Sequence, residues 1–363
     1  MRRSAPSRRI RRWLVAGLSL VGLGVALLQE VLAPQSAMGT EGTESAAAAE
    51  EGLSDLDALN VALTSSRAAC EAALPAHHSH ERAVATWNLR WFPFGTAPEH
   101  ADSDHESDIR WMACVMAHLQ ADIIAVQEVL NNDAAQAAQK RLLSRLDELT
   151  GGRHRIVLDE CAADSQHVGF IYNAKRVQLL EEHVEASLNP GGSACRFRLR
   201  PGVSGRFRFL EADDVIDELT IIAVHFDSGV TGRDHGNRLR SLQALRELTT
   251  NADQQTLAIG DFNTMGSKGK SNSAQESAQE ERDKLESRSG LTRLVPQQPC
   301  THYQRGHASE LDHALVTASL GRKAHLTTWG PCAARQCQAL GKAFSAFSEH
   351  VSDHCPLRVA LTN

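Results

Sequence analysis

Short apolar runs rich in β-branched residues recur between residues 83 and 361, and most of them end in polar side chains. The run LAIG, for example, leads directly into Asp261 and Asn263. Side chains at i and i+2 of an extended strand point the same way, so this acid and this amide face a common space beyond the sheet. An Asx-rich turn has a similar composition. The choice depends on whether the rest of the chain supplies partners for Asp261.

Other runs end in the same manner. Residues 83–87 end at Asn88, residues 121–126 at Gln127 and Glu128, and residues 219–224 at His225 and Asp227. Asp312 lies at the start of the run 311–316, and Asp353 and His354 precede the last strand. If these ends converge, several carboxylates share one cleft and repel one another unless a divalent cation neutralises them. Carboxylate and amide oxygens suit Mg²⁺, Mn²⁺ or Ca²⁺ better than zinc. The histidines add acid catalysis or charge stabilisation near pH 7.

Strand-like and helical patterns alternate irregularly over about 280 residues. We expect strands at 83–92, 121–129, 154–158, 167–173, near 206–212, and at 218–228, 256–259, 311–316 and 350–361, and helices at 105–120, 134–149 and 235–250. Residues 265–287 are polar and low in complexity, which predicts a mobile insertion that becomes helical by its end. The alternation indicates an α/β domain with more than one sheet.

The first 37 residues have the pattern of a secretory signal. Six arginines precede a 16-residue apolar run at 13–28, and small residues follow up to Ala37, where we expect cleavage. The apolar run is short for a transmembrane helix, although an uncleaved N-terminal membrane anchor is the alternative. We therefore expect export to the periplasm or the medium. Residues 38–81 are predicted to be a flexible tether with one short helix at 53–73, and residues 82–363 the folded domain.

Removal of residues 1–37 takes away six arginines and one glutamate, so the formal net charge falls from −6 to −11. Non-specific nucleic-acid binding normally relies on a broad basic face that neutralises phosphates. No such face is available on the acidic mature chain. Phosphate chemistry would have to be handled locally, by a metal ion.

All eight cysteines lie beyond the export segment. An even number in an exported chain favours two to four disulfides. The spacing of Cys332 and Cys337 differs from that of a zinc knuckle, and Cys114, which lies among apolar residues, could instead be a buried free thiol.

Six blocks carry a resemblance to a known family. In chain order they are ATWNLRWF, IIAVQEV, VHFDSG, IGDFNT, ELDHALV and SDHCPL. Each is weak alone, but six in order over 82–361 resemble the endonuclease/exonuclease/phosphatase superfamily, which includes deoxyribonuclease-I-like nucleases, abasic-site endonucleases, inositol-polyphosphate phosphatases and sphingomyelinases. The resemblance implies a four-layer α/β sandwich, with two mixed sheets packed face to face, helices outside and a metal site at one end.

The resemblance also implies roles for individual residues. Glu128 matches the principal metal-binding glutamate, with Asn88 beside it, and Asp353 resembles a second carboxylate on the metal side. The expected ion is Mg²⁺, or else Mn²⁺ or Ca²⁺.

The catalytic residues follow in the same way. Asp261 matches the aspartate that orients or deprotonates the attacking water, and Asn263 the amide that holds the phosphate. His354 resembles the histidine that stabilises the transition state, and Asp312 would pair with it and fix its tautomer. His225 stands where deoxyribonucleases and phosphatases carry histidine and many abasic-site enzymes carry tyrosine.

Several polar residues allow two interpretations. Arg200 and Arg206 could contact substrate phosphate, or they could decorate a solvated strand edge. Asp227 replaces a lysine that is frequent in the family, and either adds a metal contact or lies on the surface. The arginines at 233, 238 and 240 are expected to decorate a helix without binding substrate.

These residues together predict an exported, metal-dependent phosphodiesterase, in the first place an endonuclease that cleaves DNA or RNA by in-line attack of water. A phosphatase or a sphingomyelinase-type lipid phosphodiesterase is the alternative on the same core. A non-catalytic binding module would be expected to have lost a key position, and none is lost. We expect nucleic acid as the substrate, no stable protein partner and a monomer.

Overall fold

The computed structural model describes residues 44–75, 81–97, 106–191, 195, 199–210, 218–250, 254–268, 276–341 and 344–362, with side chains of the first helix from residue 55 onward. The expected export segment over 1–37 lies outside these residues. In the described part of the chain, no helix is both long enough and apolar enough to span a membrane.

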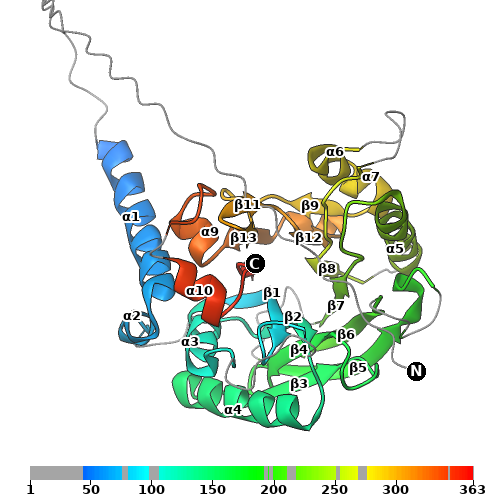
Figure 1. The fold of residues 1–363 in the computed structure, drawn as a ribbon. Helices are drawn as coiled ribbons and strands as arrows, with labels where there is room; N and C mark the ends of the chain where they lie inside the picture. The colour runs from blue at the N-terminus through cyan, green and yellow to red at the C-terminus, as the bar shows by residue number, and fades with distance from the viewer. Residues whose placement is uncertain are drawn as a thin grey trace, which may run out of the picture. The chain divides into compact units, whose positions relative to one another are not determined.

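Two six-stranded mixed sheets form the centre of the fold (Figure 1). The first contains, in spatial order, β13 (Ala324–Thr328), β14 (Leu357–Leu361), β1 (Arg82–Phe92), β2 (Ile123–Val129), β4 (His167–Asn173) and β3 (His154–Leu158). The second contains β5 (Val177–Glu185), β6 (Gly202–Phe209), β7 (Glu218–His225), β8 (Thr256–Asp261), β12 (Asp312–Val316) and β9 (Thr292–Leu294). A separate hairpin consists of β10 (His302–Gln304) and β11 (His307–Ser309).

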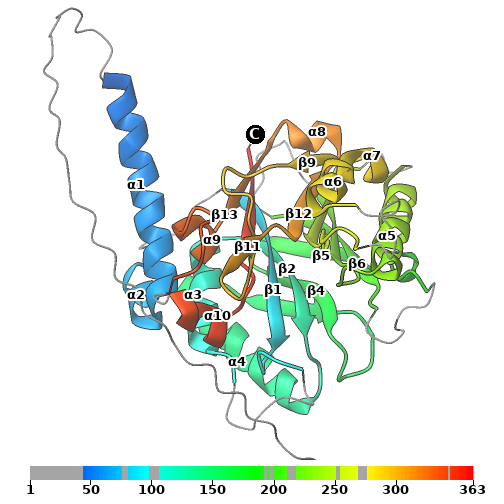
Figure 2. The same cartoon turned by 45° about the horizontal axis from the view of Figure 1, so that its top comes forward.

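Alternate residues of the central strands face different apolar layers, which explains why these runs are apolar at nearly every position. In β2, Ile123 packs between the sheets and Ile124 packs under the helices of the first sheet. In β7, Ile221 packs between the sheets and Ile222 under the helices of the second. Helices α3 (Ile109–Leu119) and α4 (Asp133–Thr150) cover the first sheet, and α5 (Gly232–Thr250) and α7 (Leu285–Ser289) the second (Figure 2). The expected four-layer sandwich is confirmed.

The helix boundaries follow local capping signals. The side chain of Asp108 accepts the N–H of Trp111 at the start of α3, and that of Asn132 accepts the N–H of Ala135 at the start of α4. Gly151, at a φ of 64°, ends α4 in the left-handed conformation that glycine adopts without strain. The remaining short helices are α6 (Ala278–Asp283), α8 (Ala318–Gly321), α9 (Pro331–Ala334), α10 (Ser345–His350) and a 3₁₀ turn at Ala186–Leu188. Helices α6 and α7 form the expected helical end of the insertion, whereas 269–275 lie outside the described residues.

The tether expected over 38–81 needs a correction in its described part. Helices α1 (Glu44–Ser65) and α2 (Arg67–Ala72) replace the single short helix, and Leu63 is fully buried in the core beneath α3. The carbonyl oxygen of Leu63 accepts the indole N–H of Trp111 at 2.8 Å, and Asn60 accepts the backbone N–H of Gly330 at 2.8 Å. Residues 55–74 are therefore part of the folded domain, which extends further toward the N-terminus than the expected start at 82.

All eight cysteines are paired. The disulfides are Cys70–Cys114, Cys161–Cys195, Cys300–Cys337 and Cys332–Cys355. Cys114 is therefore not a free thiol, and its bond attaches α2 to α3. Four disulfides fit an oxidising, extracytoplasmic location.

Candidate active site

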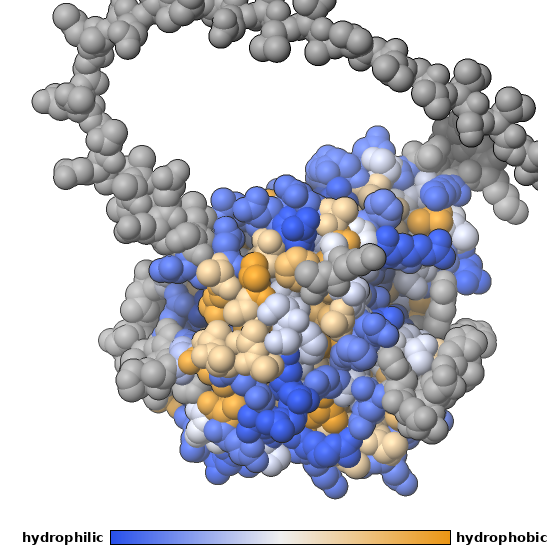
Figure 3. All heavy atoms as spheres, turned by 60° about the vertical axis from the view of Figure 1, so that its left-hand side comes forward, coloured by the Kyte–Doolittle hydropathy of each residue, from blue (hydrophilic) through white to orange (hydrophobic). Residues whose placement is uncertain are grey.

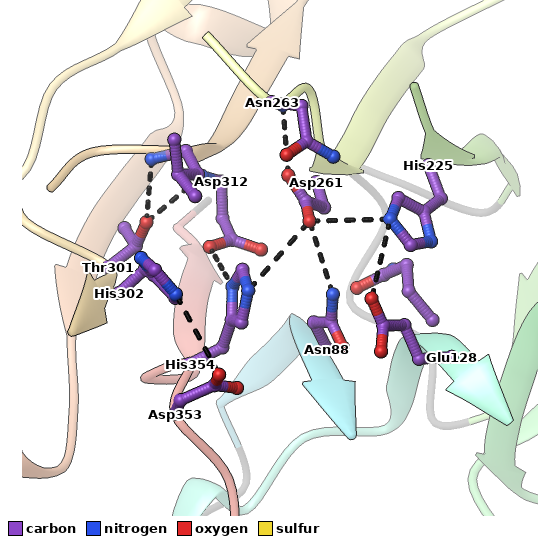
Figure 4. A network of polar contacts seen from close by, with 12 residues as sticks. Asn88, Glu128, His225, Asp261, Asn263, Thr301, His302, Asp312, Asp353 and His354 are labelled. Atoms are coloured by element: carbon purple, nitrogen blue, oxygen red, sulfur yellow. Dashed lines mark hydrogen bonds and ion pairs between the residues drawn. The ribbon is translucent and has the colours of Figure 1, made fainter. Parts of the chain in front are cut away.

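Five strands bring their polar ends to one end of the two sheets. Strands β1 and β2 run parallel, with Asn88 opposite Gln127, and β7 and β8 run parallel, with His225 opposite Asp261. Strand β12 is antiparallel to β8, so its first residue, Asp312, lies opposite Asp261. The result is a cleft of about 400 Å³. Eight expected residues meet there: Asn88, Glu128, His225, Asp261, Asn263, Asp312, Asp353 and His354 (Figure 4).

Irregular pairing between β1, β2 and β4 aims Glu128 into the cleft. The register of β1 against β2 shifts between Asn88 and Phe92, and that of β2 against β4 shifts in the two residues before Val129. Glu128 has a φ of 59° and Trp91 a φ of 50°. Left-handed backbone costs a residue with a side chain about 1–2 kcal/mol. This geometry lets the backbone N–H of Trp91 donate to Oε2 of Glu128 at 3.1 Å and hold the carboxylate in place.

His354 forms the predicted pair with Asp312. Its Nδ1–H donates to Oδ2 of Asp312 at 2.8 Å, and both side chains are buried. The backbone of His354 is held by the indole N–H of Trp87, which donates to its carbonyl oxygen, and by the hydroxyl of Ser352, which accepts its N–H. Burial alone would lower the pKa of His354, but Asp312 and the other carboxylates raise it to about 10. His354 is therefore a cation with Nε2–H directed toward Asp261.

Asp261 lies at the centre of the network. Its Oδ2 accepts from the amide of Asn88 at 3.1 Å and lies 3.5 Å from Nε2 of His225 and 3.9 Å from Nε2 of His354. Burial and the charge of Asp312 raise the pKa of Asp261 to about 7. A carboxylate of that basicity can accept a proton near neutral pH.

His225 faces the same carboxylate from the other side. Its Nε2 also lies 3.7 Å from Oε1 of Glu128, and its Nδ1 is buried without a hydrogen-bond partner in the described part of the chain. Burial, together with the positive charges of Arg200 and His354, lowers the pKa of His225 well below its usual value. His225 is therefore neutral, and its proton belongs on Nε2, which faces two carboxylates.

The residues fit a divalent cation. Burial raises the pKa of Glu128, although the charge of Arg200 opposes this shift. The pKa of Asp261 is also raised. Protein charges therefore compensate these two carboxylates only in part. A divalent cation among their oxygens would compensate them, with the amide of Asn88 adjacent. In the described residues, Asp261 and Asp312 also belong to one buried cluster with His354, which as a cation is not itself a ligand.

Asp353 lies close to an arginine and a histidine. Its Oδ2 lies 3.7 Å from Nε of Arg90 and 3.8 Å from Nε2 of His302. Burial would raise its pKa, but His302, His354 and Arg90 lower it to about 2. Asp353 is therefore already compensated without an ion, unlike Glu128. Its role as a metal ligand stays a prediction.

Asn263 has part of its hydrogen-bonding capacity committed. Its backbone N–H donates to Oδ1 of Asp261 at 2.9 Å, and its side-chain amide donates to the carbonyl of Phe226 at 3.1 Å. Asn263 lines the cleft, so the second N–H of its amide can face a substrate oxygen.

The two arginines expected near phosphate lie in different places. Arg200 is buried next to Glu128 and donates to Gln166, and it lines a second hollow of about 410 Å³. Arg206 pairs with Glu181 and Glu218, and its register partner in β7 is near the start of that strand, far from His225. The structure brings Arg200 to the site and leaves Arg206 on a charged strand surface.

Two further expectations are corrected. Asp227 is buried and accepts from the amide of Asn237 at 2.6 Å, which excludes the surface alternative and leaves the metal contact a prediction. Arg238 does not decorate an exposed helix face, because its side chain is fully buried.

Pattern reasoning missed Arg90, His302 and Thr301. His302 packs against His354 with ring centroids 4.5 Å apart and ring planes inclined at 48°, and the hydroxyl of Thr301 accepts the N–H of Asp312. Thr301 directly precedes β10 and His302 is its first residue, and this three-residue strand is too short to give a strand-end pattern. Arg90 lies in β1, but its φ of 49° departs from the extended conformation that the i and i+2 argument assumes.

Comparisons with known proteins agree with this geometry. The model of the endonuclease/exonuclease/phosphatase family matches residues 85–354. Similar solved structures include a family protein from Leptotrichia buccalis (16% identity, 78% of this chain and all of that chain, TM-score 0.53). A second is a humanized D. rerio TDP2 (13% identity, 78% of this chain and all of that chain, TM-score 0.51). A third is a family protein from Bacteroides vulgatus (15% identity, 78% of this chain and 99% of that chain, TM-score 0.51). These identities show a shared fold alone. No curated protein matches the sequence.

The family match spans every strand end that contributes to the cleft, from β1 to His354. Members of this family are typically metal-dependent phosphoesterases, and the chain has their catalytic fold. The chain therefore belongs to the endonuclease/exonuclease/phosphatase family.

Proposed function

We propose that this protein is an exported endonuclease that hydrolyses phosphodiester bonds of DNA with the help of Mg²⁺. The observation that carries the proposal is the extent of the cleft. The hollow around Arg200 adjoins the one around Asp261, since Trp91, Glu128 and Ser228 line both. A diester has a substituent on each side of its phosphorus, and the adjoining hollows offer space on both sides.

The buried residues divide the chemistry between them. Asp261, with a pKa of about 7, accepts a proton from the attacking water. The free N–H of the Asn263 amide holds a phosphate oxygen. When bound, a divalent cation at Glu128 and Asn88 would polarise the phosphoryl oxygens and neutralise the carboxylates.

The two histidines act on the negative charge that develops on the phosphate. His354, held as a cation by Asp312, directs a charged donor into the cleft, and this interaction strengthens as charge develops. His225 contributes a neutral N–H on the other side of Asp261. Arg200 supplies permanent charge to the substrate in the adjoining hollow.

A phosphatase would use the same central residues but only one of the two hollows. A sphingomyelinase-type enzyme would also need an apolar surface beside the cleft. The large apolar side chains exposed in the described residues are Val61, Leu210 and Val295, and none of them lines the cleft. On the face drawn in Figure 3, apolar side chains lie among hydrophilic ones.

The test is an assay of the purified protein on plasmid DNA with Mg²⁺, Mn²⁺ or Ca²⁺ and with EDTA, beside parallel assays on sphingomyelin and on bis-p-nitrophenyl phosphate. We expect nicking of the plasmid that EDTA abolishes and that the His354→Ala variant lacks. An intact plasmid together with turnover of the lipid or of a small phosphoester would contradict the nuclease assignment and leave the phosphoesterase core unaffected.

A further inference from the structure

Arg238 of helix α5 is among the largest side chains that are fully buried in the described part of the protein. It lies behind the cleft and does not line it. A buried guanidinium group is costly unless its charge and its donors are all matched. The partners of Arg238 therefore indicate what this side chain holds in place.

Every N–H of this guanidinium group has a partner. Nε and Nη2 donate to the two carboxylate oxygens of Glu281, at 2.7 and 3.0 Å. Nη1 donates to the carbonyl oxygens of Asp227 and Gly229, at 3.1 and 2.8 Å, and Nη2 also donates to that of Gly266, at 2.7 Å. These five bonds use all five donors of an arginine.

The three carbonyl groups belong to the two loops that form one wall of the cleft. Asp227 and Gly229 follow β7, which ends at His225, and Gly266 follows the β8 loop that contains Asn263. Glu281 completes the arrangement, because its Oε2 also accepts the N–H of Gly266 at 2.7 Å. One buried ion pair thus sets the separation of the two loops.

The same two loops are linked on the cleft side. The amide of Asn263 donates to the carbonyl of Phe226, and the N–H of Gly229 contacts Sδ of Met265 at 3.3 Å. A shift of one loop against the other would therefore move Asn263 relative to His225. The cleft residues and the buried ion pair act on the same two segments from opposite sides.

We infer that Arg238 and Glu281 are positioning residues that fix the loops after β7 and β8 in the geometry needed for turnover. The inference rests on the proposed phosphoesterase reaction but not on the identity of its substrate. A lysine at 238 would keep the charge but offer only three donors from one point, so it could not bridge Glu281 and three carbonyl groups. Arginine is required for its planar set of donors.

The test compares Arg238→Lys and Glu281→Gln with Arg246→Lys in the full chain, on whichever phosphoester the wild type turns over. Arg246 is the matched control, since it lies on the same helix but donates to Ser287 at an exposed position, at 3.4 Å. A displacement near 1 Å can cost about 10²-fold in rate. We expect kcat of both test variants to fall by about 10-fold to 10²-fold, with KM changed much less and the control within about twofold.

A readout independent of activity separates this inference from the proposed function. Amide hydrogen exchange at Gly266 should accelerate in both test variants, because its N–H loses or weakens its bond to Glu281, and remain unchanged in Arg246→Lys. Thermal unfolding shows whether each variant is folded at the assay temperature. If Arg238→Lys does not fold, Glu281→Gln decides. A folded test variant with wild-type kcat, or an equal loss of kcat in the control, would overturn the inference.

Discussion

His354 and His225 lie on opposite sides of Asp261, both buried, and their surroundings drive them to opposite protonation states. His354 has the Asp312 carboxylate at 2.8 Å and its pKa is raised to about 10. His225 has no partner for Nδ1 in the described residues, lies near two cations and has a lowered pKa. The comparison shows that a histidine at a strand end has no fixed role, and that the group behind it decides whether it is an acid or a neutral donor.

The largest effect is expected when Asp261 or His354 is removed. Asp261→Ala or His354→Ala should lower kcat by about 10³-fold or more, since each removes a group that acts on the reacting atoms. Steady-state kinetics on the established substrate measures it. Near-normal turnover in either variant would contradict the proposed roles.

Asp312→Asn should make His354 neutral, as His225 is in the wild type. Loss of the carboxylate lowers the pKa of His354, so the cation is no longer held, and kcat should fall by about 10²-fold to 10³-fold. The ¹⁵N shifts of the His354 ring in the metal-free protein report its protonation. Wild-type shifts in the variant would show that another group holds the proton.

The same pair predicts how stability depends on pH. The pKa of His354 in the folded protein, about 10, lies above that of an unfolded histidine, about 6.5. The stabilisation is therefore complete below about pH 6.5 and is lost as the pH rises toward about 10. Urea unfolding of the wild type and Asp312→Asn should differ most near pH 6, and a difference that grows with pH would refute the assignment.

His225→Gln should cost less than His354→Gln, about 10-fold against about 10²-fold in kcat, because glutamine retains a neutral N–H donor but cannot replace a cation. Parallel kinetics of the two variants makes the comparison. Equal losses would show that His225 also acts in its charged form.

The smallest effect is expected for Arg206, which lies far from His225. Arg206→Ala should leave kcat and KM within about twofold, since exposed ion pairs on a strand contribute little.

Arg200→Ala should raise KM by about 10-fold, because it removes charge from the hollow that adjoins the cleft. Substrate titrations of both variants separate the two arginines that the sequence placed together.

The strand ends could be predicted because side chains alternate between the two faces of a strand every two residues, which is a local pattern. Runs such as 121–129 and 218–228 alternate between two buried layers, so their register leaves Glu128 and His225 at the sheet edge. Family blocks then supplied roles for these positions. The sequence indicated a helix at 53–73 but not its packing against the domain, because Leu63 is buried by contacts with α3, which is distant in sequence.

The sequence by itself determined the α/β class with more than one sheet and the polar ends of the central strands, because strand period is a local property. The pairing of Asp312 with His354 came from the family resemblance. Only the tertiary structure decided that Arg238 is buried while Arg206 is not, that Cys114 bonds to Cys70, and that His225 and His354 differ in charge. Burial and electrostatic partners come from segments tens to hundreds of residues apart, and the energy of a charged group depends on those neighbours more than on its own position in the chain.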